Sequence, residues 1–144
     1  ETGRSFETIS LLQATSPLRL PDHISAAVEQ LETSTDDVVL SVSEAKNSPY
    51  FNLLEYDPKR QSYGLSKTLD TSVTRRHVMQ MNGSIYVWAR GALMQQKRVM
   101  CDAIGVYLMP PLYSVDIDTE IDWAFAELAQ QLITAQNSPP KDAL

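Results

Sequence analysis

The strongest candidate chemistry in the sequence lies in residues 114–120, which read Ser-Val-Asp-Ile-Asp-Thr-Glu. Residues i and i+2 of an extended segment point the same way, so Asp116 and Asp118 present two carboxylates on one face. Two neighbouring like charges are costly unless a cation, usually Mg²⁺, lies between or above them. The alternative is that both are solvated loop acids that help to cap the helix that follows. The Asp-x-Asp spacing is short and common, so taken alone it favours this second interpretation.

A second polar segment, residues 12–19, brings an amide, two hydroxyls and a guanidinium into one strand-to-helix turn. Gln13 and Thr15 could bind a sugar or a carboxylate, and Arg19 could hold a carboxylate through two parallel hydrogen bonds. Arg19 could equally make a structural hydrogen bond or an ion pair. By itself, the segment is better explained as an ordinary turn in which a Ser-Pro pair ends a strand.

Other polar residues carry weaker signals. The basic cluster at residues 75–77, Arg-Arg-His, could meet phosphates or an acidic sugar, although exposed arginine pairs are usually just solvated. The Asn-Gly pair at residues 82–83 is typical of a tight turn. His23 has no partner at metal-ligand spacing and is expected at the surface. Cys101 has no basic neighbour to activate it and is expected to be buried or inert. The sequence contains no P-loop, nucleophile elbow, HExxH or dinucleotide fingerprint.

The elements that must hold these residues alternate between strand and helix. Residues 8–12 predict a strand that is buried on both faces, and residues 38–42 predict a second buried strand. Between them, apolar residues at helical spacing predict a helix that is capped by Asp22 and ends near Glu32. Strand, helix and strand with short links form a βαβ unit, whose two strands run parallel with a right-handed crossover.

The pattern changes at residue 48. Residues 51–56 and 62–65 read as extended pieces around a turn at 57–60, and residues 67–80 have no clear period. We therefore expect an excursion from the sheet over residues 48–80.

Regular elements return after this excursion. Residues 84–88 predict a strand, residues 91–97 a short helix, and residues 104–109 another strand that a proline pair stops. Thr119 is expected to cap a last helix, with Asp122 in the capping-box position. The apolar stripe of that helix consists of Ile121, Ala124, Phe125, Leu128, Leu132 and Ile133.

Composition narrows the class of protein. The chain has 144 residues, 12 Lys and Arg against 18 Asp and Glu, and a formal net charge of −6. This length predicts one domain with a sizeable core. The acidic balance disfavours broad electrostatic binding to nucleic acid or to an anionic membrane, so an anionic ligand needs local arginines, backbone amides or a metal. The single cysteine excludes an intrachain disulfide. With no membrane-spanning apolar run and no signal-like start, the expected compartment is the cytoplasm.

The order and spacing of three segments are more specific than any segment alone. These segments are residues 12–19, 82–86 and 114–120. In that order they resemble the N-acylneuraminate cytidylyltransferases, the CMP-sialic acid synthetases. Residues 75–76 also fall where that family carries an Arg-Arg-Gln motif. The resemblance runs from about Ile9 to the final helix, which is nearly the whole chain. Any one motif is weak, but the ordered set is specific.

The resemblance implies an α/β fold, a Rossmann-like nucleotidyltransferase with a mostly parallel sheet and an extended dimerisation arm. Enzymes of this kind transfer CMP from CTP to a nine-carbon acidic sugar and release pyrophosphate. By resemblance, Asp116 and Asp118 are the catalytic metal ligands that hold Mg²⁺ on the triphosphate, and Arg76 meets the charge of the acidic sugar or of phosphate. The residues implied to contact the sugar are Gln13 and Thr15, with Asn82 and Tyr86 as weaker candidates.

The same resemblance places the dimerisation arm at residues 48–80 and implies a homodimer, in which Arg76 could serve the neighbouring site. Residues 1–144 are then the C-terminal part of a cytidylyltransferase domain. The family starts with a strand and a loop rich in Gly, Arg, Lys and Ser that cradles the CTP phosphates, and nothing of that kind precedes Ile9. We therefore expect no CTP turnover by these 144 residues alone. The link from Arg76 to Met81 is also shorter than the family's, which usually has Asp and Pro after Arg-Arg-Gln.

Two alternatives stay open. Within the enzyme class, the sugar could be legionaminic or pseudaminic acid, or a 3-deoxy-octulosonate, although residues 82–86 and 114–120 favour the neuraminate branch over the octulosonate one. Outside the enzyme class, the chain could be a non-catalytic dimerisation or carbohydrate-binding fragment.

Overall fold

The computed structural model describes residue 3 and residues 5–67 and 78–137. The chain divides into two compact units, one made of Glu1–Ser43 with Met81–Leu144 and the other of Glu44–Gln80. The elements follow in the order β1 Thr8–Leu12, α1 Pro21–Thr33, β2 Val38–Glu44, β3 Leu54–Asp57, β4 Ser62–Leu65, β5 Met79–Ala89, α2 Arg90–Gln96, β6 Ile104–Leu108, the 3₁₀ turn η1 Pro111–Tyr113, and α3 Glu120–Asn137.

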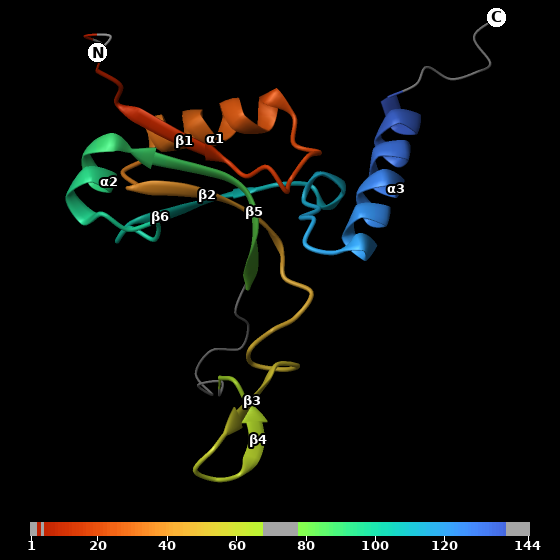
Figure 1. The fold of residues 1–144 in the computed structure, drawn as a ribbon. Coiled ribbons are helices and arrows are strands. Elements are labelled where there is room, and N and C mark those ends of the chain that lie inside the picture. The colour runs from red at the N-terminus through yellow and green to blue at the C-terminus, as the bar shows by residue number, and fades with distance from the viewer. Residues whose placement is uncertain (1–2, 4, 68–77, 138–144) are drawn as a thin grey trace, which may run out of the picture. The chain divides into compact units, whose positions relative to one another are not determined.

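Four strands form one sheet in the order β1-β5-β2-β6 (Figure 1). β2 and β6 run parallel, whereas β1 and β5 run antiparallel. β5 is also antiparallel to β2, because the Ala89 amide donates to Asp37 O at one end and the Ala45 amide to Val78 O at the other. The α/β class is therefore confirmed, but the prediction of a mostly parallel sheet is wrong. The chain enters β5 at the end of the sheet where it left β2, so these two strands pair as a hairpin with a long insert.

β1 and β2 are parallel to each other, as the βαβ prediction requires, but β5 lies between them. β1 is consequently an edge strand. Its residues Ser10, Leu11 and Leu12 are exposed, so the prediction that β1 is buried on both faces is wrong.

Apolar side chains cover both faces of the sheet around β2 and β5. α1 packs on one face, where the buried cluster consists of Ala27, Leu31, Val39, Ile85, Val87 and Met109. On the other face the buried cluster consists of Val38, Leu40, Trp88 and Cys101. Cys101 is thus buried as predicted, and burial raises the pKa of its thiol, which keeps the thiol inert at neutral pH.

The start of α1 differs from the prediction. Leu20, not Asp22, is the N-cap, and Pro21 opens the helix. The Leu20 amide donates to Nδ1 of His23 at 3.2 Å, so the histidine supplies the acceptor that a capping side chain normally provides. His23 is buried, not at the surface, and its ring lies edge-on to Tyr113 with 4.9 Å between centroids.

The capping box of α3 is confirmed. The Thr119 amide donates to Oδ2 of Asp122 at 2.8 Å, and the Asp122 amide approaches Oγ1 of Thr119 at 3.4 Å. The packing face differs from the predicted stripe, because α3 buries Ala126, Ala129 and Ile133. The large residues of the stripe are exposed, namely Ile121, Phe125, Leu128 and Leu132.

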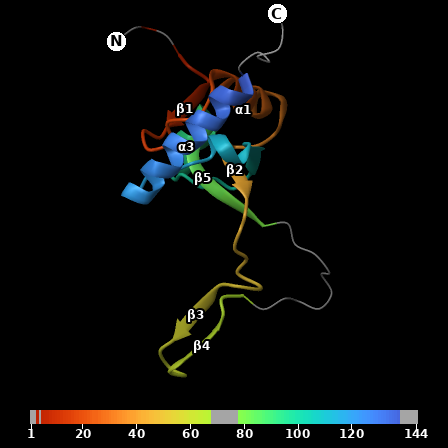
Figure 2. The ribbon, with the colours of Figure 1, turned by 90° about the vertical axis from the view of Figure 1, so that its right-hand side faces the viewer.

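β3 and β4 form a two-stranded antiparallel sheet of their own (Figure 2). Oδ1 of Asp57 accepts from the Lys59 amide at 2.9 Å in the connecting turn, so the predicted turn and the extended piece at 62–65 are confirmed. The other extended piece is shorter than predicted, because Phe51 and Asn52 lie in a turn in which both backbone amides donate to Ser48 O. The rings of Tyr56 and Tyr63 lie 5.1 Å apart on this hairpin. Among the helices that the structure describes, none is long and apolar enough to cross a membrane.

Candidate functional site

The loop after β1, the middle of β5 and the segment before α3 converge at Gly83. A β-carbon on Gly83 would lie 3.0 Å from Oε1 of Gln13 and 3.1 Å from Oδ2 of Asp116. The amide of Gln13 and the carboxylate of Asp116 therefore meet over a residue without a side chain. Gly83 has a φ of +68°, a left-handed conformation that glycine adopts without steric strain.

Gln13 and its neighbours are held by their own loop. The side-chain Nε2 of Gln13 donates to Oγ1 of Thr15 at 3.0 Å, and the backbone N–H of Gln13 donates to Ser84 O of β5 at 3.2 Å. One guanidinium nitrogen of Arg19 donates to both Gln13 O and Ser16 O at 2.7 Å. The structure thus gives Arg19 the structural role, which fixes the loop that carries Gln13 and Thr15.

Asp116 carries the clearest sign of a missing partner. Its Oδ1 is buried and has no hydrogen-bond partner among the residues that the structure describes, although buried polar atoms are nearly always satisfied. The neighbouring Ile117 amide donates to Thr15 O at 2.9 Å, which ties the Asp116 segment to the loop after β1. A carboxylate oxygen placed in this way needs a donor or a cation beyond the groups that the structure describes.

Asp118 has different surroundings. It is exposed and lines a shallow hollow with Ile117, Thr119, Glu120 and Trp123. Its own amide donates to Oδ2 of Asp122 at 3.2 Å. Across residues 5–67 and 78–137, no three His, Cys, Asp or Glu side chains gather closely enough to hold a metal ion by themselves. A cation at Asp116 would therefore take most of its ligands from water or from a bound substrate, as Mg²⁺ commonly does.

Asn82 is not in a turn, contrary to the prediction for the Asn-Gly pair, because both residues lie inside β5. The sulfur of Met109 accepts from Nδ2 of Asn82 at 3.4 Å, and Met109 belongs to the same buried cluster as Ile85.

Two serines that the sequence analysis did not single out complete this arrangement. Oγ of Ser41 donates to Oδ1 of Asn82 at 2.6 Å, and Nδ2 of Asn82 donates to Oγ of Ser114 at 3.0 Å. The available signal was Ser41 itself, a hydroxyl inside the apolar run of β2 that must find a partner when it is buried.

Tyr86 lies apart from this cluster. Tyr86 packs on the opposite face of the sheet and stacks on Trp88, with 5.7 Å between ring centroids and 13° between planes. Arg76 lies outside the residues that the structure describes. The structure therefore brings together Gln13, Thr15, Asn82 and Asp116, and it leaves the prediction for Arg76 without a position.

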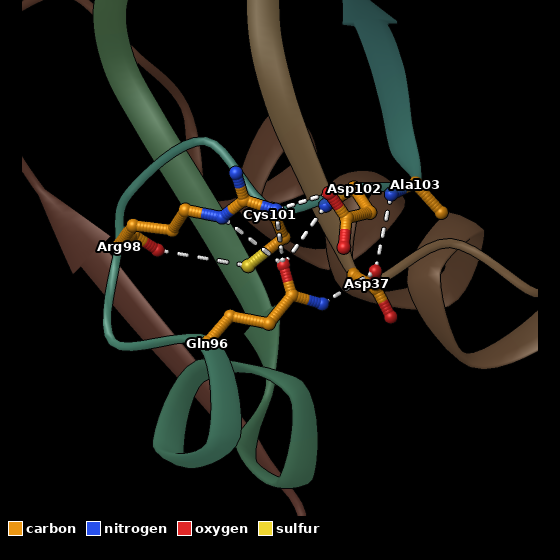
Figure 3. A network of polar contacts seen from close by, with 6 residues as sticks. All are labelled: Asp37, Gln96, Arg98, Cys101, Asp102 and Ala103. Carbon is orange, nitrogen blue, oxygen red and sulfur yellow. Dashed lines mark hydrogen bonds and ion pairs between the residues drawn. The ribbon is translucent and has the colours of Figure 1, made fainter.

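A separate polar network lies at the start of β2, where β2 faces the end of β5 (Figure 3). Oδ2 of Asp37 accepts from the Ala103 amide at 3.0 Å and from Nε2 of Gln96 at 2.9 Å. These hydrogen bonds hold the pKa of Asp37 below its usual value. Arg98 pairs with Asp102 and donates to Oε1 of Gln96, so the network fixes the loop between α2 and β6.

Comparison with known proteins gives relatives along nearly the whole chain. It is 30% identical over 137 residues to the post-translational flagellin modification protein B of Campylobacter coli and to the CMP-N,N'-diacetyllegionaminic acid synthase of Campylobacter jejuni. Each of these matches covers 95% of this chain and 57% of the relative. The chain is also 32% identical over 128 residues to the N-acylneuraminate cytidylyltransferase B of Danio rerio, covering 84% of this chain and 29% of the relative.

These relatives confirm the resemblance that the motifs indicated. The chain spans little more than half the length of the bacterial relatives that it matches over 137 residues. No protein-family profile matches the chain.

Proposed function

We propose that this chain is part of an enzyme that transfers CMP from CTP to a nine-carbon acidic sugar and releases pyrophosphate. The observation that carries the proposal is the buried, unpartnered Oδ1 of Asp116 beside Gln13. Relatives named as CMP-legionaminic acid synthase and N-acylneuraminate cytidylyltransferase support the type of reaction. A Rossmann-like nucleotidyltransferase architecture is consistent with the α/β sheet.

Mg²⁺ fits the residues present. Asp116 offers an unpartnered buried carboxylate oxygen, Gln13 offers an amide oxygen on the same side of Gly83, and Asp118 offers an exposed carboxylate. Hard oxygen ligands of this kind are the ones that Mg²⁺ prefers. We propose that Asp116 and Asp118 hold the ion, which when bound neutralises triphosphate charge and lowers the pKa of a coordinated hydroxyl.

The chain's own residues contribute mainly positioning. In-line attack of a sugar hydroxyl on the α-phosphate needs the two reactants aligned and the charge on phosphate compensated. Gln13 and Thr15 lie beside Asp116 and are proposed to orient the sugar through their amide and hydroxyl groups. Arg76 is proposed to meet the acidic group of the sugar or phosphate. Tyr86 lies on the opposite face of the sheet and stacks on Trp88, so no contact with this sugar is proposed for it.

The identity of the acidic sugar is the more specific part of the proposal. N-acylneuraminate and legionaminate fit the relatives equally, because relatives of both names match the chain at about the same identity. The decisive test is pyrophosphate release by the complete gene product, with CTP, Mg²⁺ and a panel of nine-carbon acids. Release that depends on one of these acids supports the enzyme, and the preferred acid names the substrate. No release with any acid, while the same protein binds them, would favour a carbohydrate-binding fragment instead.

We further propose that these 144 residues alone do not form CMP-sugar. The chain spans 57% of the relatives that match 95% of it, so a large part of those relatives has no counterpart in these 144 residues. A measurable rate of CMP-sugar formation by the 144-residue chain would overturn this point.

A homodimer is also proposed, with residues 48–80, which lie in the compact unit at 44–80, as the dimerisation arm. The support is a set of exposed apolar side chains on and beside the hairpin, namely Phe51, Leu53, Leu54, Tyr56, Tyr63 and Leu65. The cytoplasmic location stays a prediction.

A further inference from the structure

We infer that Asn82 is a positioning residue that fixes Asp116 through Ser114, and that its side chain does not contact the sugar. The inference deepens the proposed function, on which it rests, and it assigns the same positioning role to Ser41 and Ser114. All three side chains lie in the unit that contains the four-stranded sheet.

The side-chain amide of Asn82 has no hydrogen-bonding capacity left for a ligand. An asparagine side chain has two acceptor positions on Oδ1 and two protons on Nδ2. Oδ1 accepts from Oγ of Ser41 at 2.6 Å and from the Ser84 amide at 3.2 Å. Nδ2 donates to Oγ of Ser114 at 3.0 Å and to the sulfur of Met109 at 3.4 Å. Asn82 is only 5% exposed, so a ligand could reach it only by displacing these partners.

The hydrogen bonds on the two sides of Asn82 form one chain, in which each donor has an acceptor and every bond points the same way. The Ile85 amide donates to Oγ of Ser41 at 2.7 Å, and this hydroxyl in turn donates to Asn82. On the other side, Asn82 donates to Ser114, whose hydroxyl donates to Pro110 O at 3.0 Å. The orientation of the amide is fixed, because the Ser84 backbone N–H can only donate and must therefore face Oδ1.

This chain of hydrogen bonds ends close to Asp116 in the sequence. Ser114 lies two residues before Asp116, and the Ile117 amide, one residue after it, is held by Thr15 O at 2.9 Å. Asn82 also directly precedes Gly83, over which the Asp116 carboxylate lies. The Asn82 side chain thus bonds Ser84, which follows Gly83, and Ser114, which precedes the Asp116 segment. Residues that orient a metal ligand in this way typically change metal affinity when they are replaced.

The test compares Ser114→Ala with Ser114→Thr and with the control Ser25→Ala. Ser25 is exposed on α1 and bonds only to Pro21 O of its own helix. Mn²⁺, used as the probe, is titrated by electron paramagnetic resonance, and thermal unfolding is recorded for each variant. We expect Ser114→Ala to weaken Mn²⁺ binding by about tenfold. Ser114→Thr, which keeps the hydroxyl, should stay near the wild-type affinity, as should Ser25→Ala.

A merely structural network would behave differently. Ser114→Ala would then lower the unfolding temperature while the folded protein kept its Mn²⁺ affinity, and this result would overturn the inference. If the wild-type chain itself binds no Mn²⁺, the metal part of the proposed function fails, and the inference that Asn82 fixes the Asp116 segment is then decided by the exchange measurement that follows.

The absence of a sugar contact has its own readout in the side-chain amide signals of an ¹⁵N-labelled chain. The Nδ2 protons of Asn82 should exchange slowly with solvent, and Ser114→Ala should abolish this protection. On addition of a nine-carbon acid, the Nε2 signals of Gln13 should shift while those of Asn82 stay in place. Fast exchange of the Asn82 protons in the wild-type chain, or a larger shift for Asn82 than for Gln13, would contradict the inference. This exchange measurement needs no metal, so it separates a failure of the network from a failure of the proposed function.

Discussion

The carboxylate of Asp116 lies against the backbone of Gly83, so close that a β-carbon on residue 83 would stand 3.1 Å from Oδ2. The same β-carbon would stand 3.0 Å from Oε1 of Gln13. Contacts this short force at least one of the two polar groups to move. The absence of a side chain at residue 83 is therefore part of the candidate site, and it explains why an Asn-Gly pair occurs inside a strand.

Gly83→Ala is expected to damage both the site and the fold. An alanine at a φ of +68° is strained by about 1–3 kcal/mol, and its methyl group displaces Gln13 or Asp116. Urea unfolding should show this loss of stability, and Mn²⁺ titration should show weaker binding. Gly91→Ala is the matched control, because a β-carbon there meets nothing within 4 Å and alanine favours the helix α2. Equal effects of the two substitutions would contradict the placement of Asp116.

Asp116→Asn should separate stability from metal binding. The substitution removes a negative charge whose buried Oδ1 has no donor, so the free energy of unfolding should stay unchanged or rise by up to about 1 kcal/mol. Mn²⁺ affinity should nevertheless fall by more than about tenfold, since the variant lacks the carboxylate. Glu29→Gln, an exposed carboxyl on α1, should change neither quantity. A strongly destabilised Asp116→Asn would mean that the carboxylate has a structural partner.

The elements of the fold were largely predictable, because their signals are local. The apolar run of β2, the turn at Asp57 and the Thr119–Asp122 capping box all depend on residues near in sequence. The direction of β5 was not predictable, since a strand's sequence is the same for either direction of pairing. The direction of β5 is set by the insert at residues 44–80, which begins and ends at the same end of the sheet.

The candidate site was predictable only in part for a related reason. The order of the motifs indicated Gln13, Thr15, Asn82 and Asp116. An Asn-Gly pair fits a turn and a left-handed strand residue equally well, so the place of Asn82 inside β5 required the structure. Ser41 is 41 residues from Asn82, and no local pattern marks a contact at that distance.

The hairpin is expected to be needed for self-association. Leu54→Ser and Tyr63→Ser replace exposed apolar side chains, 64% and 70% exposed, by polar ones. The double variant should therefore shift the chain from dimer to monomer in light scattering at micromolar concentration, while its circular dichroism spectrum stays close to that of the wild type. Lys59→Ser in the connecting turn of the same hairpin should leave the dimer intact. A wild-type chain that is monomeric at that concentration would contradict the proposed dimer.

Acid should destabilise the chain partly through Asp37. Hydrogen bonds from the Ala103 amide and from Gln96 lower the pKa of this carboxyl from 3.8. Its contribution to stability is complete above that ordinary value, and it is lost as the pH falls through the lower value of the folded state. In Asp37→Asn, unfolding followed by circular dichroism between about pH 5 and pH 2 should therefore show a smaller loss of stability. The control Glu32→Gln, which changes an exposed carboxyl, should lose as much stability at acid pH as the wild-type chain does.

His23 should make stability depend on pH in a higher range. Burial lowers the pKa of His23 from 6.5, and only the nearby Asp22 opposes the shift. The unfolded chain therefore binds a proton more readily than the folded one, so stability is complete above about pH 6.5 and falls as the pH drops below it. His23→Gln keeps an acceptor for the Leu20 amide, as in a capping box, but cannot titrate. Urea midpoints measured from about pH 7.5 to about pH 5.5 should consequently depend less on pH in this variant. An unchanged slope in His23→Gln would contradict the assignment.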